Sequence, residues 1–133
     1  MKQFPLEHKI AVVTGCAGGI GAGIALGLAE AGADIVGVDL QDLEETAAQV
    51  RTLGRRFLAF QVDLSDREAV DAAWTQILAE AGGVDILVNN AGVSESTPFM
   101  EYTEDTFDKV MDLNIKGVFN ATRAAAECMV ARG

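Results

Sequence analysis

The sequence predicts an α/β fold in which a parallel sheet is covered by helices on both faces. From residue 10 onward, short apolar runs rich in β-branched residues alternate with longer segments of helical periodicity. Half of the residues are hydrophobic and glycine occurs 14 times, as is typical of strands that are buried on both faces. We expect strands at 10–14, 34–39, 57–62 and 85–89, and helices at 19–31, 42–53, 66–81, 103–113 and 114–131.

Composition limits the classes of function. A chain of 133 residues is expected to form one domain, 1–133, with a sizeable core. The net charge of −10 argues against nucleic acid or an anionic membrane as a partner. The N-terminus lacks the apolar core of a signal peptide, and the two cysteines lack metal-ligand spacing. We therefore expect a cytoplasmic protein with reduced thiols and no metal site.

The stretch from Ile10 to Gly21 is the most informative part of the chain. An apolar run ends in a glycine-rich turn, and the turn leads into a segment of good helix formers. Such a turn presents free backbone N–H groups and the positive end of the helix dipole to an anion. Its glycines allow a pyrophosphate to approach the backbone closely. The stretch therefore predicts the dinucleotide site of a Rossmann-type, doubly wound sheet.

An acidic residue at the end of the second strand indicates which dinucleotide is bound. Asp39 follows Gly21 by 18 positions, near the place where a carboxylate accepts hydrogen bonds from the ribose hydroxyls of NAD. The same carboxylate would repel the additional phosphate of NADP. Neither the turn at 16–18 nor Leu40 supplies a basic side chain to offset that repulsion. NAD is therefore the expected cofactor.

The form Thr14-Gly15-x-x-x-Gly19-Ile20-Gly21 resembles the short-chain dehydrogenase/reductase family, and three further motifs support the resemblance. Asp63 is similar to the family residue that contacts the adenine ring, and Asn89-Asn90-Ala91-Gly92 resembles the motif after the fourth strand. Asn114 resembles the family's catalytic asparagine. Together the motifs span nearly the whole chain, and they imply a sheet with strand order 3-2-1-4. The expected cofactor-binding residues are Gly15, Gly19, Ile20, Gly21, Asp39, Leu40, Asp63, Leu64, Asn90, Ala91 and Gly92.

Two of these motifs also have purely structural interpretations. Asp63 could be only the carboxylate of a turn or helix cap. The amide side chain in Asn90-Ala91-Gly92 could tie strands together, and we expect this turn to do so while also forming a wall of the adenosine pocket.

The resemblance also implies a catalytic group that this chain lacks. Family members use a Ser and a Tyr-x-x-x-Lys pair, in which the lysine lowers a phenol pKa that is otherwise about 10. Here the single tyrosine is Tyr102, and position 106 is Thr. Asn114 is thus the only member of the catalytic tetrad that is present. We expect a sheet truncated after about four strands, the cofactor-binding half of a dehydrogenase, which is inactive by itself.

Three interpretations of the function follow. The first is the cofactor-binding part of an NAD-dependent oxidoreductase acting on a secondary alcohol or ketone, with a general similarity to enzymes of sugar acids or polyols. The second is a non-catalytic NAD-binding or interaction module. The third, a Rossmann methyltransferase or a flavin protein, leaves the motif at 89–92 unexplained.

The same truncation suggests how the chain interacts with itself. The fourth strand becomes an exposed edge, and helix 114–131 lacks the neighbours on which subunits of the family pack. We expect marginal stability, or self-association through this strand and helix.

Local patterns give more detailed expectations. Ile20, Ile24, Leu28 and Ala31 have the spacing of one helix face packed on the sheet. The run 65–68 is typical of a capping box, with Ser65 as the N-cap. Cys16 lies at a helix N-terminus, where a thiol pKa can be lowered, but a small residue filling the turn is the favoured interpretation.

Overall fold

The computed structural model describes residues 5–93 and 97–133. It contains a four-stranded parallel sheet in the order β3-β2-β1-β4, as predicted. The strands are β1 (Ile10–Thr14), β2 (Asp34–Asp39), β3 (Phe57–Gln61) and β4 (Ile86–Val88). The helices are α1 (Gly19–Glu30), α2 (Glu44–Thr52), α3 (Arg67–Ala81), the short 3₁₀ helix η1 (Phe99–Glu101), α4 (Glu104–Met111), the π-helical segment η2 (Asp112–Gly117) and α5 (Val118–Arg132).

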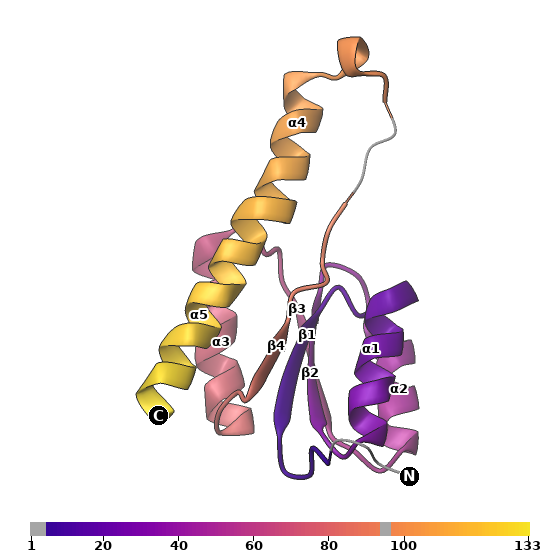
Figure 1. Cartoon of the computed structure of the whole chain (residues 1–133), viewed down its shortest axis with the longest axis vertical. Coiled ribbons are helices and arrows are strands. Elements are labelled where there is room, and N and C mark those ends of the chain that lie inside the picture. Colours follow the sequence, from indigo (N-terminus) through magenta and orange to yellow (C-terminus); the bar gives the residue numbers. More distant parts are fainter. Residues whose placement is uncertain (1–4, 94–96) are drawn as a thin grey trace.

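The sheet lies between two helical layers. Figure 1 shows α1 and α2 on one face and α3 and α5 on the other. Because successive side chains of a strand point to opposite faces, β1 divides its residues between two cores. Ala11 and Val13 belong to the core beneath α1 and α2, whereas Val12 belongs to the core beneath α3 and α5. The central strands are therefore buried on both sides, as their continuous apolar runs predict.

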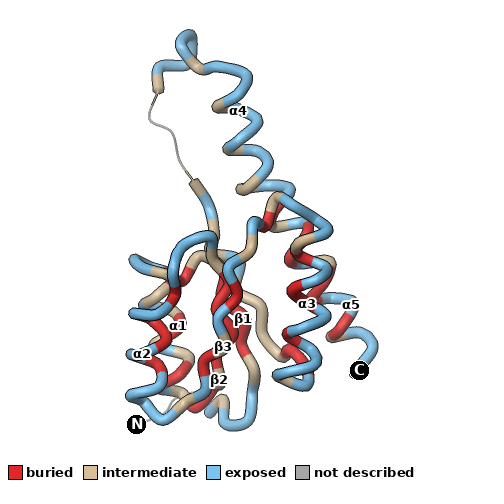
Figure 2. Tube along the Cα trace, turned by 180° about the vertical axis from the view of Figure 1, so that it is seen from behind, coloured by how far each residue is buried: buried red, intermediate tan, exposed pale blue. Residues whose placement is uncertain are grey.

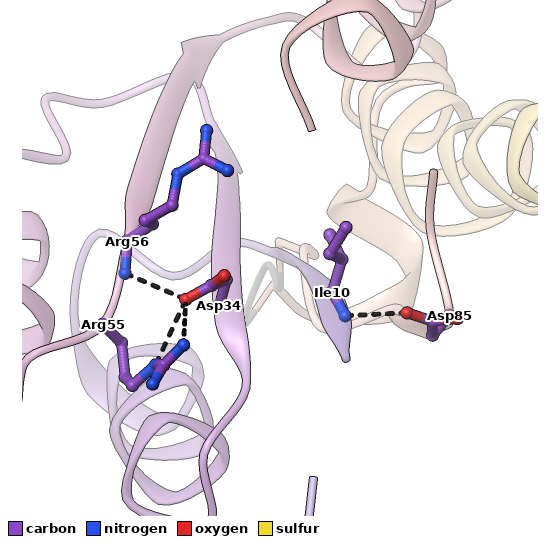
Figure 3. Close-up of polar contacts among 5 residues, drawn as sticks. All are labelled: Ile10, Asp34, Arg55, Arg56 and Asp85. Atoms are coloured by element: carbon purple, nitrogen blue, oxygen red, sulfur yellow. Dashed lines mark hydrogen bonds and ion pairs between the residues drawn. The ribbon is translucent and has the colours of Figure 1, made fainter. Parts of the chain in front are cut away.

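Polar contacts join the strands at their amino ends (Figure 3). Asp34, the first residue of β2, accepts hydrogen bonds from Arg55 Nη2 at 2.8 Å and from the Arg56 backbone N–H at 3.1 Å, next to the start of β3. Asp85, just before β4, accepts one from the Ile10 N–H at 2.9 Å and forms an ion pair with Arg132. These carboxylates help to fix the register of β2 with β3 and of β4 with β1.

The predicted apolar face of α1 is confirmed for Ile24 and Leu28, which pack against the core beneath α1 and α2, but it is wrong for Ile20. Ile20 is 78% exposed, and the buried residues of α1 are Gly21, Ala25 and Ala29. The reason is steric. A Cβ at Gly21 would lie 2.1 Å from the Gly15 carbonyl oxygen, so the first turn of the helix approaches the glycine turn through Gly21, and the neighbouring Ile20 points outward.

The predicted break between two helices at 113 and 114 is also wrong. Helices α4 and α5 are joined through η2 into one continuous helix, whose α4 end projects beyond the sheet (Figure 1). Figure 2 shows that this outer part is mostly exposed, and among the described residues none in α4 is buried. A π-helical segment has about one more residue per turn than an α-helix. The pattern of apolar residues in the sequence gives no signal for such a segment.

The start of α3 also differs from its prediction. The N-cap is Asp66, whose side chain accepts a hydrogen bond from the Ala69 N–H at 3.2 Å. Ser65 instead donates its hydroxyl to Asp63 Oδ1 at 2.6 Å, so the capping box centred on Ser65 is not formed. A carboxylate directly after a serine competes for the N-cap, and here the carboxylate occupies it.

The contacts of Asp85 lead to a stability prediction. Replacing Asp85 with Ala removes the acceptor of the Ile10 N–H and the partner of Arg132. We expect the free energy of unfolding to fall by about 1–3 kcal/mol in urea denaturation. Asp71→Ala is the matched control, because Asp71 is exposed and lies 3.8 Å from Arg67. Its effect should stay within about 0.5 kcal/mol. Equal effects of the two substitutions would show that Asp85 does not hold β1.

Candidate cofactor site

The glycine turn lies at the carboxyl edge of the sheet, between β1 and α1. Gly15 adopts φ 69° and donates its N–H to the Val38 carbonyl oxygen at 2.8 Å. A Cβ at Gly15 would lie 2.7 Å from the Ala91 Cα, so a side chain is excluded there. The N-cap of α1 is Gly18, which offers no side chain to the amides of the first turn. An added Cβ at Gly18 or Gly19 meets no described atom within 4 Å. The turn thus presents an open N-terminal backbone, as an anion requires.

The Asp39 carboxylate lies beside this turn. Its Oδ2 accepts a hydrogen bond from the Ala17 N–H at 3.0 Å, and its Oδ1 accepts one from the Gln41 N–H at 3.0 Å. Both donors are backbone amides. A carboxylate has about four lone-pair sites, so Asp39 retains acceptor capacity for a ligand.

The turn after β4 forms the facing wall. The Thr14 hydroxyl accepts hydrogen bonds from the backbone N–H groups of Asn90 and Ala91, both at 3.0 Å. The Asn90 side-chain amide donates to the Gly15 carbonyl oxygen at 3.0 Å. The expectation that this amide ties strands together is confirmed. The two turns are therefore joined by three hydrogen bonds.

Asn114 lies within η2 and contacts the next stretch of the wall. Its Oδ1 accepts a hydrogen bond from the Val93 N–H at 2.8 Å, and its Nδ2 donates to the Val93 carbonyl oxygen at 2.7 Å. A Cβ at Gly92 would lie 3.1 Å from Asn114 Oδ1, so the two segments are in close contact. In this structure the Asn114 side chain is thus engaged with the backbone of the wall.

These segments enclose a cavity of about 310 Å³. Seven of the predicted cofactor residues line it: Gly15, Asp39, Leu40, Leu64, Asn90, Ala91 and Gly92. Within the described chain, the other four, Gly19, Ile20, Gly21 and Asp63, are not among its lining residues. Gly21 lies against Gly15 under the turn, and Asp63 is exposed and holds Ser65. The turn interpretation of Asp63 thus accounts for its observed contacts.

Several lining residues were missed by the sequence reasoning: Ala17, Gly18, Gln41, Val62, Val93 and Leu113. Each lies within two positions of a residue that a motif had already indicated. Their positions next to a motif could have predicted them, whereas their side chains carry no distinctive chemistry.

Cys16 is fully buried, which contradicts a lowered pKa at the helix N-terminus. Burial, and secondarily the negative charge of Asp39, raise the pKa of the thiol from 9.0 to about 11. The Sγ atom would lie 2.9 Å from a Cβ at Gly37, so the thiol packs directly against β2. The favoured interpretation, a small residue filling the turn, agrees with this packing.

The fold and the cavity together define the class of protein: a parallel α/β sheet with a cavity at its carboxyl edge, where ligands bind in open α/β folds. The short chain dehydrogenase family model matches residues 9–133. The chain therefore belongs to the short-chain dehydrogenase family, which is a family of oxidoreductases.

Two curated relatives illustrate the similarity within this family. The chain is 48% identical over 133 residues to 2-dehydro-3-deoxy-D-gluconate 5-dehydrogenase of Escherichia coli (strain K12), matching all of this chain and 53% of that protein. It is 35% identical over 127 residues to galactitol 2-dehydrogenase of Agrobacterium fabrum, covering 96% of this chain and 49% of that one. The chain thus spans about half the length of the curated relatives it matches.

Solved structures agree with this assignment. NAD⁺-bound xylitol dehydrogenase gives a TM-score of 0.92 at 32% identity, covering 96% of this chain and 50% of that one. Carveol dehydrogenase from Mycobacterium avium in complex with NAD gives a TM-score of 0.91 at 29% identity, covering 98% of this chain and 52% of that one.

Among residues 5–93 and 97–133, no group of three or more His, Cys, Asp or Glu side chains is placed to hold a metal ion. In the same part of the chain, no helix has the length and apolar character needed to cross a membrane.

The environment of Cys16 leads to a prediction about its reactivity. In a Cys128→Ala variant, we expect the native Cys16 thiol to resist iodoacetamide at pH 8 and to react only as the pH approaches 11. The physical reason is that the thiolate is the nucleophile, and burial disfavours it. The same variant unfolded in urea is the control and should react readily at pH 8. Equal rates in the native and unfolded states would contradict the burial of the thiol.

Proposed function

We propose that this chain binds NAD as the cofactor-binding part of an NAD-dependent dehydrogenase that acts on a secondary alcohol or ketone of a sugar acid. The observation that carries the cofactor assignment is the Asp39 carboxylate, which lines the same cavity as the glycine turn. The substrate class is supported by the relatives, which include 2-dehydro-3-deoxy-D-gluconate 5-dehydrogenases from three bacteria at 44–48% identity.

The residues of the cavity fit this cofactor. The unobstructed surface at Gly18 and Gly19 leaves room for a pyrophosphate at the N-terminus of α1. The remaining acceptor sites of Asp39 suit the two adenosine ribose hydroxyls. Val62 and Leu64 add apolar surface to the cavity, on which an adenine ring can pack. Bound NAD would supply the hydride acceptor for oxidation of the alcohol.

Asn114 is assigned a positioning role in this proposal. Its two hydrogen bonds with Val93 hold the part of the wall that follows Gly92, and Val93 lines the cavity. The residues that would transfer a proton to or from substrate are the Ser and the Tyr-x-x-x-Lys pair of the family pattern, which this sequence does not contain.

The charge of Asp39 leads to the central test of the cofactor assignment. We expect isothermal titration calorimetry to show tighter binding of NAD than of NADP by the wild-type chain. Asp39→Ala should weaken NAD binding about tenfold, because it removes charge-assisted hydrogen bonds, and should narrow the gap to NADP. Asp42→Ala is the matched control, since Asp42 is exposed and its carboxylate accepts the Glu44 N–H outside the cavity. An unchanged ratio of NAD to NADP affinity in Asp39→Ala would show that Asp39 does not bind the ribose.

Binding without turnover is the second expectation. With NAD and 2-dehydro-3-deoxy-D-gluconate or a related secondary alcohol, the 133-residue chain should produce no NADH, because the only tyrosine, Tyr102, has Thr106 where the pair needs lysine. Steady production of NADH by the pure chain would contradict this.

A fusion distinguishes an oxidoreductase half from a non-catalytic module. The chain joined to the C-terminal half of its Escherichia coli relative should regain dehydrogenase activity, whereas the same fusion carrying Asp39→Ala should show a raised KM for NAD. A folded fusion that binds NAD without turnover would favour the module.

A further inference from the structure

One peptide group of the glycine turn is held at both of its ends. The Cys16 carbonyl oxygen accepts a hydrogen bond from the Thr46 hydroxyl at 2.7 Å. The N–H of the same peptide, which belongs to Ala17, donates to Asp39 Oδ2 at 3.0 Å. Two side chains from different elements therefore fix the orientation of this peptide plane.

Thr46 is firmly placed to do this. It belongs to the first turn of α2 and is 1% exposed. Its neighbours Ala47 and Val50 are buried in the core beneath α1 and α2, so the helix face that carries the hydroxyl is itself fixed. A helical threonine commonly bonds the carbonyl four residues earlier, as Thr52 does with Ala48 in the same helix. Thr46 instead reaches across to the turn.

The consequence extends to the Asp39 carboxylate. Because the Ala17 N–H is directed at Oδ2 and the Gln41 N–H at Oδ1, the carboxylate is held between two backbone donors. Rotation of the Cys16–Ala17 peptide would remove one of these donors and release the carboxylate from its orientation. Thr46 opposes that rotation, because the rotation would leave the buried Cys16 carbonyl oxygen without its hydrogen-bond donor.

We propose that Thr46 is a positioning residue for cofactor recognition: its hydroxyl fixes the Cys16–Ala17 peptide, and that peptide holds the Asp39 carboxylate ready for the adenosine ribose. This inference rests on the proposed function. Thr46 does not line the cavity, and its role in NAD selectivity is exerted through the Cys16–Ala17 peptide group.

The test compares three variants by calorimetry with NAD and with NADP. Thr46→Val keeps the shape but removes the hydroxyl, and should weaken NAD binding about three- to tenfold while reducing the NAD/NADP ratio. Thr46→Ser keeps the hydroxyl and should bind NAD within about twofold of wild type. Thr52→Val is the control for loss of a threonine hydroxyl from α2, and should bind both cofactors as wild type does.

A double-mutant cycle separates action through Asp39 from a general loss of structure. If Thr46 acts through Asp39, adding Thr46→Val to Asp39→Ala should cause no further loss of NAD affinity. Additive losses of NAD affinity in the cycle would overturn the assignment. A folded Thr46→Val variant with unchanged NAD/NADP selectivity would also overturn it, as would a Thr46→Ser variant that binds NAD as weakly as Thr46→Val.

Amide hydrogen exchange provides a readout that needs no cofactor. The Ala17 amide should be protected in the ligand-free wild-type chain, and its protection should fall in Thr46→Val but not in Thr52→Val. Rapid exchange at Ala17 in the wild type would overturn the peptide constraint, even if Thr46→Val fails to fold. Absence of NAD binding by the folded wild type, with Ala17 protected, would instead overturn the proposed function and with it the role in recognition.

Discussion

The close approach of the glycine turn to the turn after β4 is the constraint on which the site depends. The space between them is so small that a Cβ at Gly15 would come within 2.7 Å of Ala91, and one at Gly21 within 2.5 Å of the Asn90 amide. The hydrogen bonds from Asn90 to the Gly15 carbonyl and to the Thr14 hydroxyl can form only at this separation. Close packing of small residues therefore brings the ends of β1 and β4 together, and the cavity lies where these ends meet the end of β2.

The negative charge at the cavity wall is stabilised by nearby backbone dipoles. The chain carries a net charge of −10, yet the Asp39 carboxylate at the cavity wall is balanced by two backbone N–H groups rather than by a cation. Backbone dipoles can stabilise an anion without adding a bulky side chain to a narrow site. Among the described residues that line the cavity, none is lysine or arginine, in agreement with the proposed selection against an additional phosphate.

The sequence predicted the strand order because the apolar runs and the motifs that follow them recur at fixed positions. The apolar runs placed all four strands within one or two residues, and the motifs identified seven residues that line the cavity. Two of the failures depend on packing that the pattern of apolar residues does not encode. Ile20 is turned outward by the contact of Gly21 with Gly15, and the thiol of Cys16 is buried by β2. Neither contact leaves a periodic signal.

The long helix formed by α4, η2 and α5 is continuous in its hydrogen bonding but not uniform in its packing. In α5, Ala121 and Ala125 are buried in the core, whereas among the described residues none in α4 is. Local opening costs least where few contacts are lost, so this helix should fray from Glu104 inward. The two hydrogen bonds between Asn114 and Val93 lie at the boundary between the packed and unpacked parts of this helix. Transient melting of α4 can thus proceed toward that boundary while the contact between Asn114 and Val93 persists.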